Sequence, residues 1–123
     1  MTKRIMVADD NAAIRRALRK ILEFRKDWTV DSEAVNGRDA VEKAQKSTPD
    51  LIVLDVSMPV MNGLEAARVL HHLLPRVPLI LCSLHMDDLL EKEAFAAGVD
   101  AVVSKAQNMQ ILVSKAQELL EAD

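Results

Sequence analysis

Four short apolar runs mark the chain, and chemically usable polar groups follow each of them. The runs are residues 5–8, 51–54, 79–82 and 101–103, and the groups that follow are Asp9 and Asp10, Asp55, Ser83, and Ser104 with Lys105. Runs of this length that are apolar at every position are typical of strands buried on both faces of a parallel sheet. Because parallel strands end at the same edge, we expect these polar groups to gather on one rim, where open α/β sheets bind their ligands.

Segments with helical spacing separate the runs. Asn11 is suited to cap a first helix with apolar positions at 14, 17, 18, 21 and 22, and the other side of this helix carries Arg15, Arg16, Arg19 and Lys20. In residues 28–34, positions that suit a buried face alternate with polar ones: Trp28, Val30, Ser32 and Ala34 alternate with Thr29, Asp31 and Glu33. This alternation predicts a strand with one solvated flank at the edge of the sheet.

Turn and cap residues divide the rest of the chain. Asn36-Gly37 is expected to form a turn, Asn62-Gly63 belongs to a loop that opens a helix, Asp87 or Asp88 can cap the next helix, and Gly98 can close it. Five strand–helix units in 123 residues predict an α/β three-layer sandwich, since a closed barrel of eight units needs about twice this length. The edge position of the second strand selects the flavodoxin-like order 2-1-3-4-5 for a (βα)5 parallel sheet.

Composition and charge limit the function classes. The formal charge of -3 and the pI of about 5.6 argue against direct nucleic acid binding, which requires a basic face. We find no apolar stretch near the roughly 20 residues that span a bilayer, and Met1–Arg4 leads directly into a strand, so we expect a cytoplasmic protein. The one cysteine, Cys82, is expected to be a buried strand residue.

The rim residues predict phosphoryl chemistry. Asp9, Asp10 and Asp55 would lie at the tips of neighbouring strands about 5 Å apart, and three such carboxylates repel one another unless a cation joins them. Mg²⁺, which prefers one or two carboxylates, waters and a phosphate oxygen, fits better than Ca²⁺. Ser83 and Lys105 would add a hydroxyl donor and a positive charge, both suited to a phosphoryl oxygen. An aspartate in this setting can act as a nucleophile on phosphorus.

The motifs together resemble the active-site set of the receiver domains of two-component response regulators. The matching positions, which span the whole chain, are Asp9-Asp10, Asp55 with Met58-Pro59 and Gly63, Ser83 and Lys105. The segments 53–56 and 62–67 are similar to receivers that carry a LuxR-type helix-turn-helix output domain. No such domain follows Asp123, so we expect one receiver domain over residues 1–123, either stand-alone or excised from a longer regulator.

The resemblance implies a role for each site residue. Asp55 would accept a phosphoryl group from a sensor histidine kinase, and Lys105 would be its ion-pairing partner. Mg²⁺ would be bound by Asp10 and Asp55 directly, by Asp9 through water and by the main-chain carbonyl of Ser57. The hydroxyl of Ser83 would move to meet the phosphoryl group.

The resemblance also implies a signalling output. The fourth helix, fifth strand and fifth helix would form a face that changes its affinity for an output domain or for a second copy of the chain. The protein would not otherwise be an enzyme, since it would catalyse only its own phosphorylation and dephosphorylation.

Three positions depart from the family pattern. Val102 stands where an aromatic residue usually couples to the hydroxyl residue, Leu84 is bulkier than the small residue that commonly follows the hydroxyl, and Ala106 replaces the proline that often follows the lysine. We expect His71, His72 and His85 to be surface residues outside the chemistry.

Three alternatives remain at this point. A haloacid-dehalogenase-type phosphatase also phosphorylates an aspartate, but it requires a second aspartate at the position of Ser57. A flavodoxin cradles phosphate in its first loop, where Asp9-Asp10 would repel it unless a metal intervened. A receiver could also act without phosphate through constitutive protein contacts, although the complete acidic set argues against this.

Overall fold

Five parallel strands form one sheet in the order β2-β1-β3-β4-β5 in the computed structural model, which describes residues 2–122. The strands are β1 (Lys3–Ala8), β2 (Trp28–Ala34), β3 (Leu51–Asp55), β4 (Leu79–Ser83) and β5 (Ala101–Ser104). The helices that alternate with them are α1 (Ala12–Glu23), α2 (Gly37–Ser47), α3 (Gly63–Leu73), α4 (Asp88–Ala96) and α5 (Gln110–Glu121). The predicted strand order and the three-layer α/β flavodoxin-like fold are confirmed.

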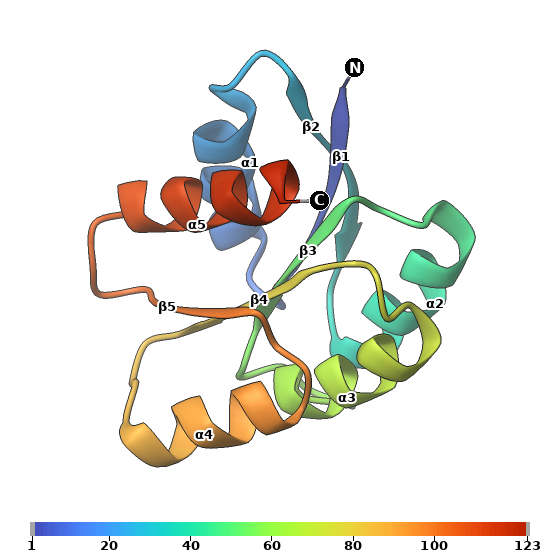
Figure 1. Cartoon of the computed structure of the whole chain (residues 1–123), viewed down its shortest axis with the longest axis vertical. Helices are drawn as coiled ribbons and strands as arrows, with labels where there is room; N and C mark the ends of the chain where they lie inside the picture. Colours follow the sequence, from blue (N-terminus) through green and yellow to red (C-terminus); the bar gives the residue numbers. More distant parts are fainter. Residues whose placement is uncertain (1, 123) are drawn as a thin grey trace.

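Two helical layers cover the sheet, with α1 and α5 on one face and α2, α3 and α4 on the other (Figure 1). In β2 a register shift against β1 breaks the alternation of faces, so that Val30 packs toward α1 and α5 but Ala34 packs toward the opposite layer. Successive residues of the other strands alternate between the two faces: Ile5 packs toward α1 and α5, whereas Met6 packs toward the opposite layer. Both side chains are 0% exposed. This burial on both faces is the reason that the central strands are continuously apolar in sequence.

Side-chain caps fix where α1, α2, α3 and α4 begin, whereas α5 has no such cap. The Asn11 carboxamide oxygen accepts hydrogen bonds from the backbone N–H groups of Ala13 and Ile14 at 2.9 and 3.2 Å, as the sequence predicts. Asn62 and Glu65 form a reciprocal capping box at the start of α3. Each cap contributes about 1 kcal/mol to helix stability and sets the direction in which the preceding loop leaves the sheet.

The structure corrects the prediction of a turn at Asn36-Gly37. The pair does not form a free turn: Asn36 caps α2 by accepting a hydrogen bond from the N–H of Asp39 at 2.8 Å, and Gly37 is the first residue of the helix. The Gly37 N–H donates to the Met61 carbonyl at 2.9 Å, and a Cβ atom at Gly37 would lie 2.3 Å from that oxygen. A contact between two loops therefore requires the glycine here.

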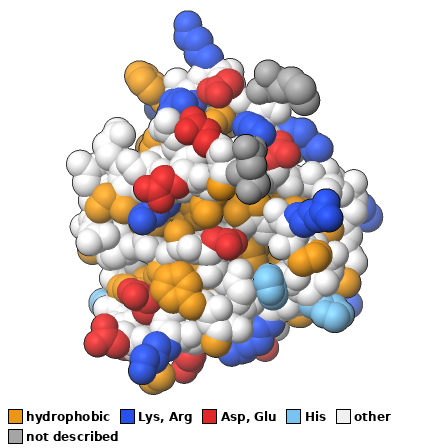
Figure 2. All heavy atoms as spheres, viewed as in Figure 1, with side chains coloured by type: hydrophobic (Ala, Val, Ile, Leu, Met, Phe, Trp, Pro, Cys, Tyr) orange, Lys and Arg blue, Asp and Glu red, His pale blue; other side chains and the backbone are white. Residues whose placement is uncertain are grey.

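Charged side chains of both signs are interspersed with apolar ones on the face shown in Figure 2. All three histidines are exposed, which agrees with their predicted position at the surface. Among residues 2–122, no helix is long and apolar enough to cross a membrane.

Candidate functional site

The strand register brings the predicted polar groups to one rim. Ala8 pairs with Leu54, Asp55 with Cys82, and Ser83 with Ser104, so Asp9 follows β1 beside the end of β3 and Lys105 follows β5 beside the end of β4. All of the predicted site side chains line one hollow of about 700 Å³, which contains Asp9, Asp10, Asp55, Ser57, Ser83 and Lys105 together with Leu84 and His85. Parallel pairing therefore places groups that are distant in sequence at one edge.

The Lys105 ammonium connects two of the carboxylates. Its Nζ lies 2.9 Å from Asp9 Oδ2 and 2.7 Å from Asp55 Oδ1, and only 16% of the lysine side chain is exposed. Burial raises the pKa of Asp55, the hydrogen bond from Lys105 opposes this rise, and the charges of Asp9 and Asp10 add to it. Burial alone would lower the pKa of Lys105, but its bonds to Asp55 and Asp9 raise it above the usual range.

The three carboxylates form a donor set that fits a hard divalent cation. One oxygen from each of Asp9, Asp10 and Asp55 lies within 4.8 Å of the others. Asp9 and Asp55 are buried and Asp10 is exposed, so the set opens toward solvent on one side. Mg²⁺ keeps several waters when it binds to proteins, and an open cluster of carboxylate oxygens suits it.

The Ser83 hydroxyl is engaged within its own loop. Its Oγ donates to the main-chain carbonyl of His85 at 2.9 Å and accepts from the N–H of the same residue at 3.2 Å. Leu84 lines the hollow but is 64% exposed. Half-buried Val102 lines a different hollow of about 540 Å³ on the other side of this loop.

The loop after Asp55 is held by tight backbone contacts. Gly63 lies so close that a Cβ atom would come within 2.1 Å of the Asp55 carbonyl oxygen. The Met61 N–H donates to the Pro59 carbonyl at 2.7 Å across Val60, which has a φ of 70°. A β-branched residue in this left-handed region is strained, so the loop beside the acid is held by its surroundings rather than by local preference.

Two arginines on the polar side of α1 have a partner that the sequence does not identify. Arg15 and Arg19 reach β2, where both donate to the Glu33 carboxylate. These contacts lower the pKa of Glu33, chiefly through the hydrogen bond from Arg19. Helical spacing correctly places both arginines away from the apolar side of α1. It contains no information about the edge strand β2, which lies beside that side of the helix.

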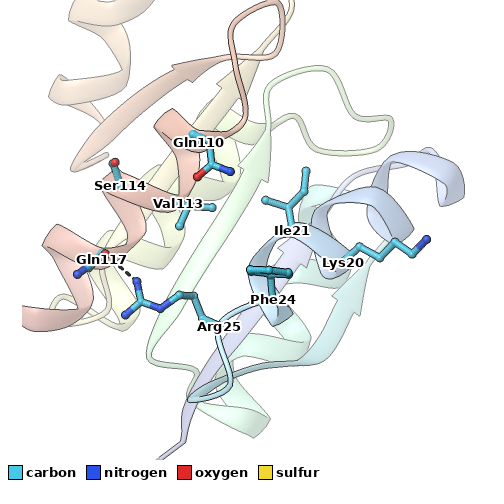
Figure 3. Close-up of a pocket in the computed structure, with 8 residues that line it drawn as sticks. All are labelled: Lys20, Ile21, Phe24, Arg25, Gln110, Val113, Ser114 and Gln117. Carbon is cyan, nitrogen blue, oxygen red and sulfur yellow. Dashed lines mark hydrogen bonds between the residues drawn. The ribbon is translucent and has the colours of Figure 1, made fainter.

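A second hollow of about 740 Å³ lies between α1 and α5, away from the acidic rim. Figure 3 shows Ile21 of α1 and Phe24, which directly follows α1, on one side and Val113 of α5 on the other. The Arg25 guanidinium closes one end by donating to the Gln117 side-chain oxygen at 2.7 Å. Among the described residues that line this groove there is no carboxylate.

A comparison with protein families matches residues 5–117 to the model described as "Response regulator receiver domain". A chemotaxis protein CheY from Thermotoga maritima is 34% identical over 113 residues, which are 91% of this chain and 93% of the relative. The transcriptional regulatory protein LnrK from Bacillus subtilis is 31% identical, and the match covers 89% of this chain but 50% of LnrK. The chain thus spans nearly all of one relative and half of the other.

Solved structures show the same architecture. The response regulator domain of Thermotoga maritima CheB superposes with a TM-score of 0.92 at 28% identity, covering 100% of this chain and 99% of that domain. A LuxR-family two-component response regulator from Aurantimonas superposes with a TM-score of 0.93 at 28% identity, covering 98% of this chain and 86% of that one. The similarity covers the whole sheet and the helices on both of its faces.

Proposed function

Because this chain belongs to the response regulator receiver domain family, we propose that Asp55 accepts a phosphoryl group from a histidine kinase, with Mg²⁺ at the carboxylate cluster. The observation that carries the proposal is the Lys105 ammonium, held 2.7 Å from Asp55 and 2.9 Å from Asp9. A mostly buried positive charge between two carboxylates favours the ionised form of Asp55 before transfer and can neutralise phosphoryl oxygens afterwards.

The transfer step assigns a role to each side chain. A carboxylate oxygen of Asp55 attacks the phosphorus of a phosphohistidine, the P–N bond breaks, and the imidazole nitrogen takes the electron pair and then a proton. Mg²⁺ bound by Asp9, Asp10, Asp55 and the Ser57 carbonyl would supply positive charge to the phosphoryl oxygens. Lys105 stays close enough to pair with one of these oxygens. Attack by water on the phosphorus later breaks the bond between phosphorus and the Asp55 oxygen, which releases inorganic phosphate and restores the carboxylate.

The Ser83 hydroxyl offers a route from phosphorylation to signalling. It is bonded to the His85 backbone in this state, so contact with a phosphoryl oxygen requires it to leave that bond. The loop 83–87 leads into α4, and its rearrangement would alter the face made by α4, β5 and α5. An output domain or a second copy of the chain would read that change.

Two alternatives from the sequence are set aside by membership of the receiver family. The chain is neither a haloacid-dehalogenase-type phosphatase nor a flavodoxin. Receiver domains are in general signalling modules without a separate enzymatic activity, and an activity such as the methylesterase of some relatives is a property of those longer proteins.

The experiment that tests the proposal is intact mass measurement after incubation with phosphoramidate and Mg²⁺. The parent should gain one phosphoryl group that is stable in acid and lost in base, and chelation of Mg²⁺ should prevent the gain. Asp55→Asn should abolish it, whereas Asp88→Asn, which changes an exposed aspartate on α4, should leave it intact. An unmodified parent protein, or modification that survives Asp55→Asn, would refute the proposal.

A further inference from the structure

The Asp9 main chain is held from both sides. Its N–H donates to the Ala34 carbonyl of β2 at 3.0 Å, and its own carbonyl accepts a hydrogen bond of 2.7 Å from Arg15 Nη1. The Arg15 Nε donates in turn to Glu33 Oε1 at 2.9 Å. Since Glu33 and Ala34 are consecutive in β2, these contacts close a ring from Asp9 through Arg15 to the edge strand and back.

The ring determines the position of Asp10. The carbonyl that Arg15 holds belongs to the peptide group between Asp9 and Asp10, and this group is planar. Fixing the direction of its C=O therefore fixes the plane from which the Asp10 backbone continues. Asn11 holds the next peptide, since its N–H donates to Asp9 Oδ1 at 2.9 Å while its side chain caps α1.

Arginine is required at position 15 by the geometry of the two bonds. A planar guanidinium directs its Nε and Nη1 donors to two different acceptors at the same time, the Glu33 carboxylate and the Asp9 carbonyl. A lysine would keep the charge but offers one ammonium on a flexible stem. The Arg15 side chain is 15% exposed, so its loss would leave polar groups unpaired in a mostly buried position.

We propose that Arg15, anchored by Glu33, is a positioning residue that sets the geometry of the Asp9–Asp10 pair and thereby the affinity of the carboxylate cluster for Mg²⁺. The inference rests on the proposed function, because it concerns the same site. Residues that orient metal ligands through such outer contacts alter metal affinity by about 10–100-fold when they are removed.

Arg19 is the matched control. It shares the Glu33 carboxylate with Arg15 and also donates to the Val30 carbonyl at 2.6 Å, but among residues 2–122 its hydrogen bonds and ion pairs do not include Asp9. Loss of Arg19 removes comparable polar contacts between α1 and β2 without releasing the Asp9 carbonyl. If Arg15 had only a structural role, the Arg15 and Arg19 variants would bind Mg²⁺ with similar affinity. If Arg15 positions the metal ligands, only its own variants should bind Mg²⁺ more weakly.

The test is calorimetric titration of the parent protein, Arg15→Ala, Arg15→Lys and Arg19→Ala with Mg²⁺, with melting temperatures measured in chelator. Both Arg15 variants should raise the Kd for Mg²⁺ about tenfold or more, and Arg19→Ala should keep it within about twofold of the parent although its melting temperature also falls. Arg15→Lys keeps the charge and supplies the result if Arg15→Ala does not fold.

Three results would overturn the inference. Both Arg15 variants could bind Mg²⁺ with the Kd of the parent protein, or Arg15→Lys alone could do so. Arg19→Ala could also weaken Mg²⁺ binding as much as the Arg15 variants do. A parent that binds Mg²⁺ but takes no phosphoryl group would refute the proposed function while the affinities still decide the role of Arg15. A parent that binds no Mg²⁺ would refute both.

Discussion

The acidic rim and the groove between α1 and α5 have nearly the same volume, about 700 and 740 Å³, but opposite chemistry. The rim brings three carboxylates, a hydroxyl and an ammonium from four strand ends to one place. The groove has an apolar floor, an exposed phenylalanine and a hydrogen bond from the Arg25 guanidinium to the uncharged Gln117 side chain. The comparison shows how the functional site of this fold is identified. The criterion is the convergence of charged groups from several strand ends, and not the volume of a hollow.

The largest effect should come from removing the cation of the rim. Lys105→Ala leaves Asp9 and Asp55 without their shared partner and takes away a charge that faces the phosphoryl oxygens, so phosphorylation by phosphoramidate should slow by about 10²-fold or more. Lys20→Ala removes a cation from the groove instead and should leave the rate within about twofold. Rates from intact mass against time check both, and equal rates in the two variants would invalidate the distinction between the regions.

Neutralising one acid should stabilise the fold while weakening metal binding. The charge of Asp10 contributes to the raised pKa of Asp55, which marks an unfavourable interaction between like charges. We expect Asp10→Asn to melt about 2–5 °C higher than the parent in chelator and to lose most of the increase that Mg²⁺ gives the parent. Differential scanning calorimetry with and without Mg²⁺ measures both melting temperatures. A parent protein whose melting temperature does not change with Mg²⁺ would contradict the prediction.

The groove should tolerate truncation of its most prominent side chain. Phe24 is 88% exposed, so Phe24→Ala should change the free energy of unfolding by less than about 0.5 kcal/mol and leave the phosphorylation rate unchanged. Leu22, two residues earlier and inside α1, is 0% exposed, and Leu22→Ala should cost about 2–5 kcal/mol. Urea unfolding of both variants gives the contrast. A slower phosphorylation of Phe24→Ala would connect the groove to the chemistry.

The smallest effect concerns the only tryptophan. Trp28 begins β2 opposite Lys3, so it lies at the other end of the sheet from Asp55, roughly 20 Å away along the strands. Mg²⁺ has no unpaired electrons, and we expect titration with it to change the intrinsic fluorescence very little even where the melting temperature rises. Saturable quenching would show that metal binding reorganises the far end of the sheet.

The sequence predicts the rim well because its signals are local. Each apolar run ends at a polar residue, and parallel pairing converts these ends into one edge without further information. The strand order, the Asn11 cap and burial of Met6 and Cys82 follow from the same patterns. Burial also raises the pKa of the Cys82 thiol to about 12, which agrees with a strand residue that has no reactive role.

The sequence misses features that depend on contacts between distant segments. Asn-Gly in isolation indicates a turn, but here Asn36 caps a helix and the Met61 carbonyl lies against Gly37, which leaves no room for a side chain. Arg15 lies on the expected flank of α1, yet only the folded chain places Glu33 and the Asp9 carbonyl within its reach. Helical periodicity gives the direction of a side chain but not the partner that it meets.

The most direct test of the account is to locate the phosphoryl group chemically. Borohydride reduces an aspartyl phosphate to homoserine, and peptide sequencing by mass spectrometry then identifies the position. The account predicts homoserine at position 55 after treatment with phosphoramidate and Mg²⁺, and none when Mg²⁺ is chelated. Homoserine at position 9 or 10 instead, or a phosphorylated protein that yields no homoserine, would contradict the assignment of Asp55 as the phosphoacceptor.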